Sequence, residues 1–109
     1  IKGAVRFDTD KATLSSADKA RLKTLAKQLR NVGFNEVTVE GHADARGPAE
    51  YNRKLSNRRA KAVENYLKSQ GIKASSYKTE AKGESDPVAP NTSVEGRRLN
   101  RRATINLKE

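Results

Sequence analysis

Hydrophobic and polar residues alternate along the chain with two different periods, which predict strands and helices. A period of two predicts four strands, near residues 3–7, 37–41, 77–81 and 103–107. A period close to 3.6 predicts two amphipathic helices, over residues 17–32 and 49–70. Ser15 can cap the first helix, and Gly33 and Gly71 are expected to end the two helices.

These elements predict the order β-α-β-α-β-β, in which strand–helix–strand units favour parallel strands joined by right-handed crossovers. We therefore expect an α+β two-layer sandwich, with a four-stranded mixed sheet and two long helices on one face. The second helix should present four apolar side chains to the sheet: Leu55, Ala62, Val63 and Tyr66. Residues 83–96 contain two prolines and predict a long connection.

Length and charge restrict the class of protein. The chain has 109 residues, of which 23 are Lys or Arg and 13 are Asp or Glu, giving a formal net charge of +10. This length suits one domain with one core, and no apolar run is long enough for a transmembrane helix. The stretch from Ile1 to Phe7 is short and carries Lys2 and Arg6, so we do not expect it to be a signal peptide. We predict that residues 1–109 form a single domain excised from a longer exported protein, with any membrane attachment through segments outside this chain.

The residue types present argue against catalysis. Cysteine is absent and His42 is the only histidine, so zinc sites built from Cys or from several His residues are excluded. No nucleophile motif accompanies His42, and no cluster of carboxylates with metal-ligand spacing is evident. We predict no catalytic residue, no metal and no cofactor, and we expect His42 to be a structural hydrogen-bonding residue at a strand end.

The second predicted helix contains a polar anomaly. Arg59 and Asn52 fall in the middle of its apolar stripe, whereas other charges lie on the opposite side: Arg53, Lys54, Lys61, Glu64 and Lys68. A buried guanidinium must be paired, because an unpaired one is strongly destabilising. Either Arg59 reaches an edge or pairs with an internal carboxylate, or Arg59 and Asn52 line a pocket where the guanidinium grips a ligand carboxylate.

Asp44 supplies a complementary charge. It follows the predicted strand 37–41 in a Gly- and Pro-containing loop that leads into the second helix. Ligands of open strand–helix sheets bind beyond the carboxyl ends of strands, so Asp44 and Arg59 can face one crevice. Such a pair suits a zwitterionic amino-acid centre, but a plain Asp44–Arg59 salt bridge is equally compatible with the sequence.

A longer motif surrounds these residues. The run Val39-Glu40-Gly41-His42-Ala43-Asp44-Ala45-Arg46-Gly47, followed by Tyr51-Asn52, Leu55-Ser56 and Arg58-Arg59-Ala60, resembles the OmpA-like peptidoglycan-binding domain. Phe7-Asp8 and Asn100-Arg101-Arg102 fit the same pattern, so that the resemblance covers essentially the whole chain. The resemblance implies the α+β fold and non-covalent binding of the peptidoglycan stem peptide through meso-diaminopimelate.

Roles for individual residues follow from the resemblance. It implies that Asp44 holds the ammonium of diaminopimelate and that Arg59 holds its carboxylate. Asn52 would support the loop or touch the ligand, Asp10 would frame the pocket, and Arg101 would lie near the ligand. The family further implies a periplasmic location at the outer membrane of a Gram-negative bacterium, anchoring of that membrane or of an envelope complex to the wall, and other envelope proteins as partners.

Two other classes of function remain open from the residues alone. A nucleic-acid-binding domain would suit the positive charge and the four arginines near the C-terminus: Arg97, Arg98, Arg101 and Arg102. Only five aromatic residues exist and no stacking platform is visible, so we expect no nucleic-acid partner. A wall-degrading enzyme would need a nucleophile, a metal or a placed pair of carboxylates, and the sequence reveals none beyond the isolated Asp44.

Overall fold

The computed structural model describes residues 1–109 as one sheet with helices on one side. The elements are β1 (Lys2–Arg6), α1 (Ser16–Leu29), β2 (Gly33–Gly41), α2 (Ala49–Ser69), β3 (Lys73–Ala81), α3 (Val94–Asn100) and β4 (Arg102–Lys108). The strand order is β1-β4-β2-β3, with β2 and β3 parallel and β4 antiparallel to both of its neighbours. The α+β sandwich with a four-stranded mixed sheet is therefore confirmed.

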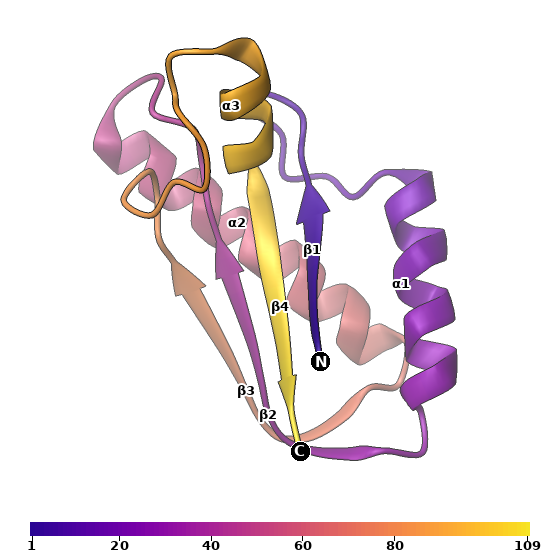
Figure 1. Ribbon diagram of the computed structural model, residues 1–109. Coiled ribbons are helices and arrows are strands. Elements are labelled where there is room, and N and C mark those ends of the chain that lie inside the picture. Colours follow the sequence, from indigo (N-terminus) through magenta and orange to yellow (C-terminus); the bar gives the residue numbers. More distant parts are fainter.

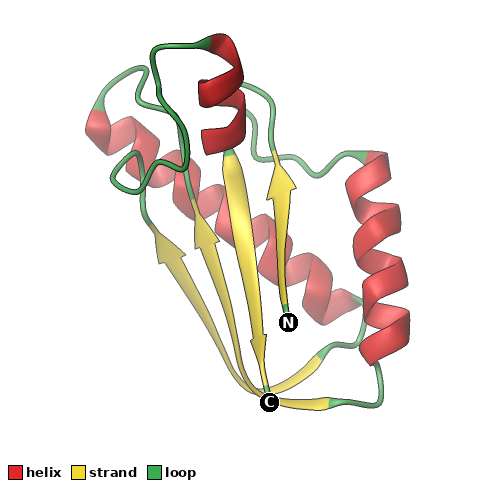
Figure 2. Ribbon diagram, in the orientation of Figure 1, coloured by secondary structure: helices red, strands yellow, loops and turns green.

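The two long helices share one face of the sheet, and no helix lies over the opposite face (Figures 1 and 2). Alternation along the strands sends apolar side chains to the helical side, where Val37, Val39 and Ile105 are almost fully buried. Leu22 of α1 and Val63 of α2 join the same cluster of 15 buried apolar residues. None of the helices is both long and apolar enough to cross a membrane.

Helix α1 begins as predicted but ends three residues early. The Ser15 side chain accepts a hydrogen bond from the Asp18 amide at 3.0 Å, as expected of an N-cap. The helix ends at Leu29, not Val32, and Gly33 begins β2 instead of terminating a helix. The reason is sheet pairing: β2 extends back to Gly33, which pairs with Lys73 of β3.

Helix α2 has the predicted start and ends beside Gly71, whose φ of 86° is in the left-handed region that favours glycine. Its buried stripe is rotated from the prediction toward Ser56, Ala60 and Glu64, while Ala62 and Tyr66 are only partly buried. The placement of Glu64 among the exposed charges was wrong. Its carboxylate is buried and pairs with Lys61 and Lys68, at 3.6 and 2.9 Å.

Gly41 lets α2 approach the end of β2 very closely. A Cβ atom at this position would lie 1.7 Å from the backbone oxygen of Ser56, a distance that no side chain can occupy. The close approach places the middle of α2 beneath the loop that follows β2.

The predicted connection over residues 83–96 was only partly right, because a third helix, α3, begins within it at Val94. Ser93 caps this helix by accepting from the Gly96 amide at 2.9 Å. Buried Asn100 then fastens the preceding loop by accepting from the amide of Val88 and donating to the carbonyl of Ala89, at 2.8 and 2.9 Å. Seven residues are too few for a helical period to stand out from the sequence.

Candidate functional site

A pocket of about 390 Å³ lies where the ends of β1, β2 and α3 meet the first half of α2. It is lined by all five residues that the sequence analysis selected: Asp10, Asp44, Asn52, Arg59 and Arg101. The loop after β1 supplies Asp10 and the loop after β2 supplies Asp44. The fold thus brings the selected residues together; their roles in binding remain predictions.

Arg59 is one of the residues that line this pocket, and it is fully buried. Its guanidinium donates to three backbone carbonyl oxygens, those of Lys11 at 2.8 Å, His42 at 2.9 Å and Asp8 at 3.0 Å. The guanidinium carbon also lies 5.4 Å from the centre of the Phe7 ring, within cation–π range. Arg59 therefore joins the loop after β1 to the end of β2.

These contacts bear on two of the three interpretations of Arg59; whether it also grips a ligand carboxylate stays a prediction. It neither reaches an edge nor pairs with an internal carboxylate, so those two expectations were wrong. A guanidinium has five N–H groups, and the three carbonyl bonds leave two of them free. Burial, reinforced by nearby Arg101, lowers the pKa of Arg59 to about 10, which still leaves the side chain charged at neutral pH.

Asp44 is also buried, but it is paired with other arginines. One carboxylate oxygen accepts from the backbone amide and Nε of Arg46, at 3.0 and 3.2 Å. The other accepts from Nη2 of Arg46 at 2.9 Å and from Nη1 of Arg101 at 3.4 Å. Burial acts to raise the pKa of Asp44, but the hydrogen bonds from Arg46 outweigh it and hold the pKa below its usual value.

The expected alternative of an Asp44–Arg59 salt bridge is therefore wrong, because the partners of Asp44 are Arg46 and Arg101. Arg46 also lines the pocket, a position that was not expected from the sequence. A signal existed, since an aspartate in a loop often accepts from the amide two residues later, which brings that residue's side chain alongside.

Asn52 and Asp10 shape the pocket. The Asn52 amide donates to the carbonyl oxygen of Arg46 and to the carboxylate of Glu84, both at 2.9 Å. Asn52 therefore supports the loop after β2, one of its two expected roles. Asp10 adopts a φ of 59°, in the left-handed region, and its carboxylate accepts from the Tyr51 hydroxyl at 3.1 Å.

The four arginines near the C-terminus have different surroundings in the structure. Arg101 turns into the pocket, donating from Nε to the Phe7 carbonyl at 3.0 Å, while Arg102 donates to the Asp86 carbonyl at 3.2 Å. Arg98 is exposed and pairs with Glu95. Arg97 donates to the Asn91 carbonyl at 3.0 Å, so three of the four arginines bind backbone carbonyls within the fold.

His42 differs from its expected role. Its backbone amide donates to the Arg102 carbonyl at 2.8 Å, but neither ring nitrogen has a hydrogen-bond partner although the residue is only 1% exposed. His42 is therefore a hydrogen-bonding residue at the strand end through its backbone amide and carbonyl only, and its ring does not share this role. Burial, with a further contribution from Arg102, lowers the pKa of His42 to about 4, so that the imidazole is neutral at physiological pH.

Comparison with known proteins identifies the family. Residues 6–101 match the model of the OmpA family. The chain is 41% identical over 101 residues to outer membrane protein A of Bordetella avium, covering 93% of this chain and 52% of that protein. It is likewise 41% identical over 101 residues to the peptidoglycan-associated lipoprotein of Agrobacterium fabrum, covering 93% and 57%. The chain spans between about a third and just over half of the curated relatives it matches first.

Solved structures agree with this assignment. The cell wall anchor of the T6SS from Pseudomonas aeruginosa superposes with a TM-score of 0.82 at 33% identity, covering 99% of this chain and 81% of that one. The peptidoglycan-associated lipoprotein from Burkholderia pseudomallei gives 0.83 at 28% identity, covering 96% and 89%. On its sequence and its fold, the chain belongs to the OmpA family.

Proposed function

We propose that this domain binds peptidoglycan non-covalently in the pocket and anchors an outer-membrane protein or envelope complex to the wall, in the periplasm of a Gram-negative bacterium. The observation that carries the proposal is the pair of separate charges, Asp44 and Arg59, which line one pocket without bonding to each other. Relatives named as a peptidoglycan-associated lipoprotein and a cell wall anchor support the same ligand.

The ligand group that best matches these charges is the zwitterionic end of meso-diaminopimelate in the stem peptide. Its ammonium would take the place of Arg46 on Asp44. The Arg46 side chain is half exposed and would swing outward by giving up its bonds to Asp44 and to Thr9 Oγ1. Its carboxylate would accept from the two remaining N–H groups of Arg59, with Arg101 beside them. A pocket of about 390 Å³ suits the end of a peptide rather than a long polymer.

The strength of such binding can be estimated. Hydrogen bonds to charged groups contribute roughly 1.5–3 kcal/mol each, which corresponds to about 10–100-fold in affinity per contact. The net charge of +10 would add a weaker, salt-sensitive attraction to the carboxylates of the wall.

The pocket favours binding over catalysis. A general acid at neutral pH needs a raised carboxyl pKa, whereas the pKa of Asp44 is lowered by its arginine partners despite burial. The only histidine, His42, has its ring outside the set of pocket-lining residues. We therefore propose a binding module and no hydrolytic step.

Co-sedimentation with isolated sacculi tests the proposal. Asp44→Asn removes the anion that would hold the ammonium, so the variant should lose most of its binding, by about tenfold or more in affinity. The same substitution raises the net charge by one, so a merely basic surface would bind the wall more tightly. Arg98→Gln lowers the charge by one on an exposed side chain and is the matched control. Equal or stronger sedimentation of Asp44→Asn contradicts the proposal.

A further inference from the structure

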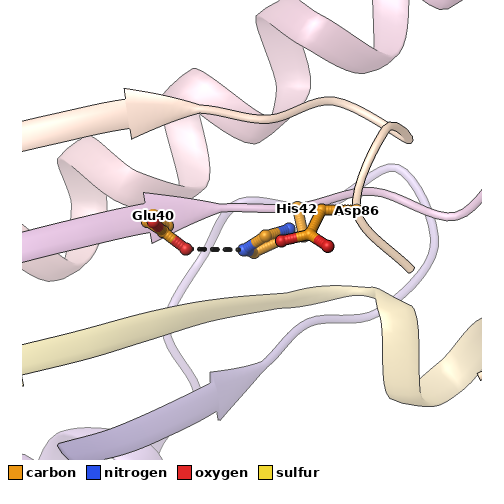
Figure 3. A group of neighbouring side chains, drawn as sticks. All are labelled: Glu40, His42 and Asp86. Atoms are coloured by element: carbon orange, nitrogen blue, oxygen red, sulfur yellow. Dashed lines mark ion pairs between the residues drawn. The ribbon is translucent and has the colours of Figure 1, made fainter. Parts of the chain in front are cut away.

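A second group of polar side chains lies behind the pocket, on the other side of the end of β2. Because side chains alternate along a strand and Gly41 faces α2, its neighbours Glu40 and His42 point away from that helix. The loop after β3 brings Asp86 to the same place (Figure 3). One ligand-type atom from each of the three residues lies within 4.8 Å of the others.

The imidazole of His42 is the unusual member of this cluster. The residue is 1% exposed, and both Nδ1 and Nε2 lack a hydrogen-bond partner. A buried polar group without a partner destabilises a protein by roughly 1–3 kcal/mol, and such groups are rare in folded domains. Oε1 of Glu40 lies 3.5 Å from Nε2, too far for a good hydrogen bond (Figure 3).

The two carboxylates are available as ligands. Asp86 is exposed, and its carboxylate takes part in no ion pair. Glu40 accepts only a long hydrogen bond, from Thr104 Oγ1 at 3.4 Å. The nearby buried Arg102 donates to the backbone carbonyls of Asn100 and Asp86 and leaves both carboxylates free.

The spacing fits a small divalent ion. Zn–N and Zn–O bonds of about 2.0–2.2 Å place two tetrahedral ligand atoms roughly 3.3 Å apart, close to the 3.5 Å between Glu40 and His42. The wider separation of up to 4.8 Å can close by rotation of exposed Asp86. One imidazole with two carboxylates matches Zn²⁺, whereas Ca²⁺ and Mg²⁺ prefer oxygen ligands alone.

We propose that Glu40, His42 and Asp86 bind one divalent transition-metal ion of the Zn²⁺ type, with water completing the coordination. The ion would give the buried imidazole its missing partner and would fasten the loop after β3 to the end of β2. This site is separate from the peptide pocket and does not depend on the proposed function.

The single histidine makes a direct test available. In an untagged, chelator-treated sample, the ring nitrogens of His42 give the only imidazole signals in a long-range ¹H–¹⁵N NMR spectrum. One equivalent of ZnCl₂ should shift those signals in a saturable manner and raise the melting temperature. MgCl₂ at the same concentration should do neither. Imidazole signals that do not move with Zn²⁺ overturn the proposal.

Substitutions then separate the site from adventitious binding elsewhere. Glu40→Gln and Asp86→Asn should each weaken Zn²⁺ binding by more than about tenfold in calorimetry. Glu36→Gln, a carboxylate on the same strand and the same face, is the matched control and should bind as the unsubstituted chain does. His42→Gln should abolish Zn²⁺ binding. If this variant does not fold, the Zn²⁺ affinities of the two carboxylate variants still test the proposal. Undiminished binding by both carboxylate variants overturns the proposal.

A last variant distinguishes the two proposals. Asp44→Asn should keep Zn²⁺ binding while losing the wall, because Asp44 lies on the pocket side of the loop. Asp86→Asn should keep wall binding while losing the metal. The two variants together therefore show which of the two proposals fails, because one readout is wall binding and the other is Zn²⁺ binding.

Discussion

The pocket lined by Asp44 and Arg59 and the Glu40–His42–Asp86 cluster lie on opposite sides of the same strand end. The buried polar groups of the two regions differ in whether they have hydrogen-bond partners. In the pocket, buried Arg59 donates to three backbone carbonyls and buried Asp44 accepts from two arginines. In the cluster, buried His42 has no partner for its ring and is held neutral. The pocket is therefore a preorganised polar network, whereas the cluster contains a buried ring whose nitrogens lack hydrogen-bond partners.

The largest effect should come from removing the centre of the pocket network. Arg59→Ala leaves the carbonyls of Lys11, His42 and Asp8 without their donor, and each unsatisfied buried group costs roughly 1–3 kcal/mol. We expect the free energy of unfolding to fall by at least about 3 kcal/mol in urea denaturation. The exposed neighbour Arg58 supplies the control, since Arg58→Ala should cost less than about 0.5 kcal/mol. A similar small loss for both variants would refute this view of Arg59.

The neutral imidazole predicts a distinct sensitivity to acid. Since the pKa of His42 falls from 6.5 to about 4 on folding, the unfolded chain binds the extra proton between these values. The contribution of His42 to the free energy of unfolding should therefore be complete above pH 6.5. It should decline by up to about 3 kcal/mol as the pH falls to 4. The charged groups around the ring are Arg102 and Lys82, which add to this shift, Asp86, which opposes it, and Glu40, whose Oε1 lies 3.5 Å from Nε2.

Asp44 affects stability over a different pH range from His42, so one experiment distinguishes the two residues. Its pKa lies below the ordinary value of 3.8, so its contribution is present above that pH and is lost only below it. Urea denaturation from pH 7.5 to 3.5, with a chelator present, should therefore show a slope beginning near pH 6.5. A flat profile between pH 6.5 and 5 would contradict the assignment of a neutral, buried His42.

The smallest expected effect is on ligand affinity and comes from substituting Arg46, whose side chain pairs with Asp44. If the ligand ammonium displaces this half-exposed side chain, Arg46→Ala removes a competitor. Affinity for a diaminopimelate peptide should stay equal or rise a few-fold, as measured by calorimetry. A tenfold loss would mean that Arg46 itself holds the ligand.

Much of the fold was predictable because its signals are local. The cap at Ser15, the turn at Gly71 and the alternation of Val37 and Val39 each depend on neighbouring residues, and each is confirmed. The end of α1 was missed because pairing between β2 and β3, a long-range effect, extended the strand back to Gly33. The helix α3 was missed because it is too short to show a period.

The pocket was predictable in its residues but not in its bonds. Arg59 and Asn52 interrupt an apolar stripe, which marks them as polar residues directed inward, but only tertiary structure reveals that backbone carbonyls receive the guanidinium. The cluster on the other side went unnoticed, because Asp86 comes from a loop more than forty residues beyond His42. Loops of this kind carry no periodicity from which their contacts can be inferred.

The central claim is that one pocket recognises both charges of a zwitterionic peptide end, and calorimetric titration of soluble stem peptides tests it most directly. The diaminopimelate peptide should bind about tenfold or more tightly than the lysine peptide, which lacks the terminal carboxylate for Arg59. Amidation of that carboxylate should cost a similar factor. Surface attraction is screened beyond ~8–10 Å at ordinary salt, so the preference should persist when salt is raised. Equal affinities for the two peptides, both vanishing with salt, would contradict the account.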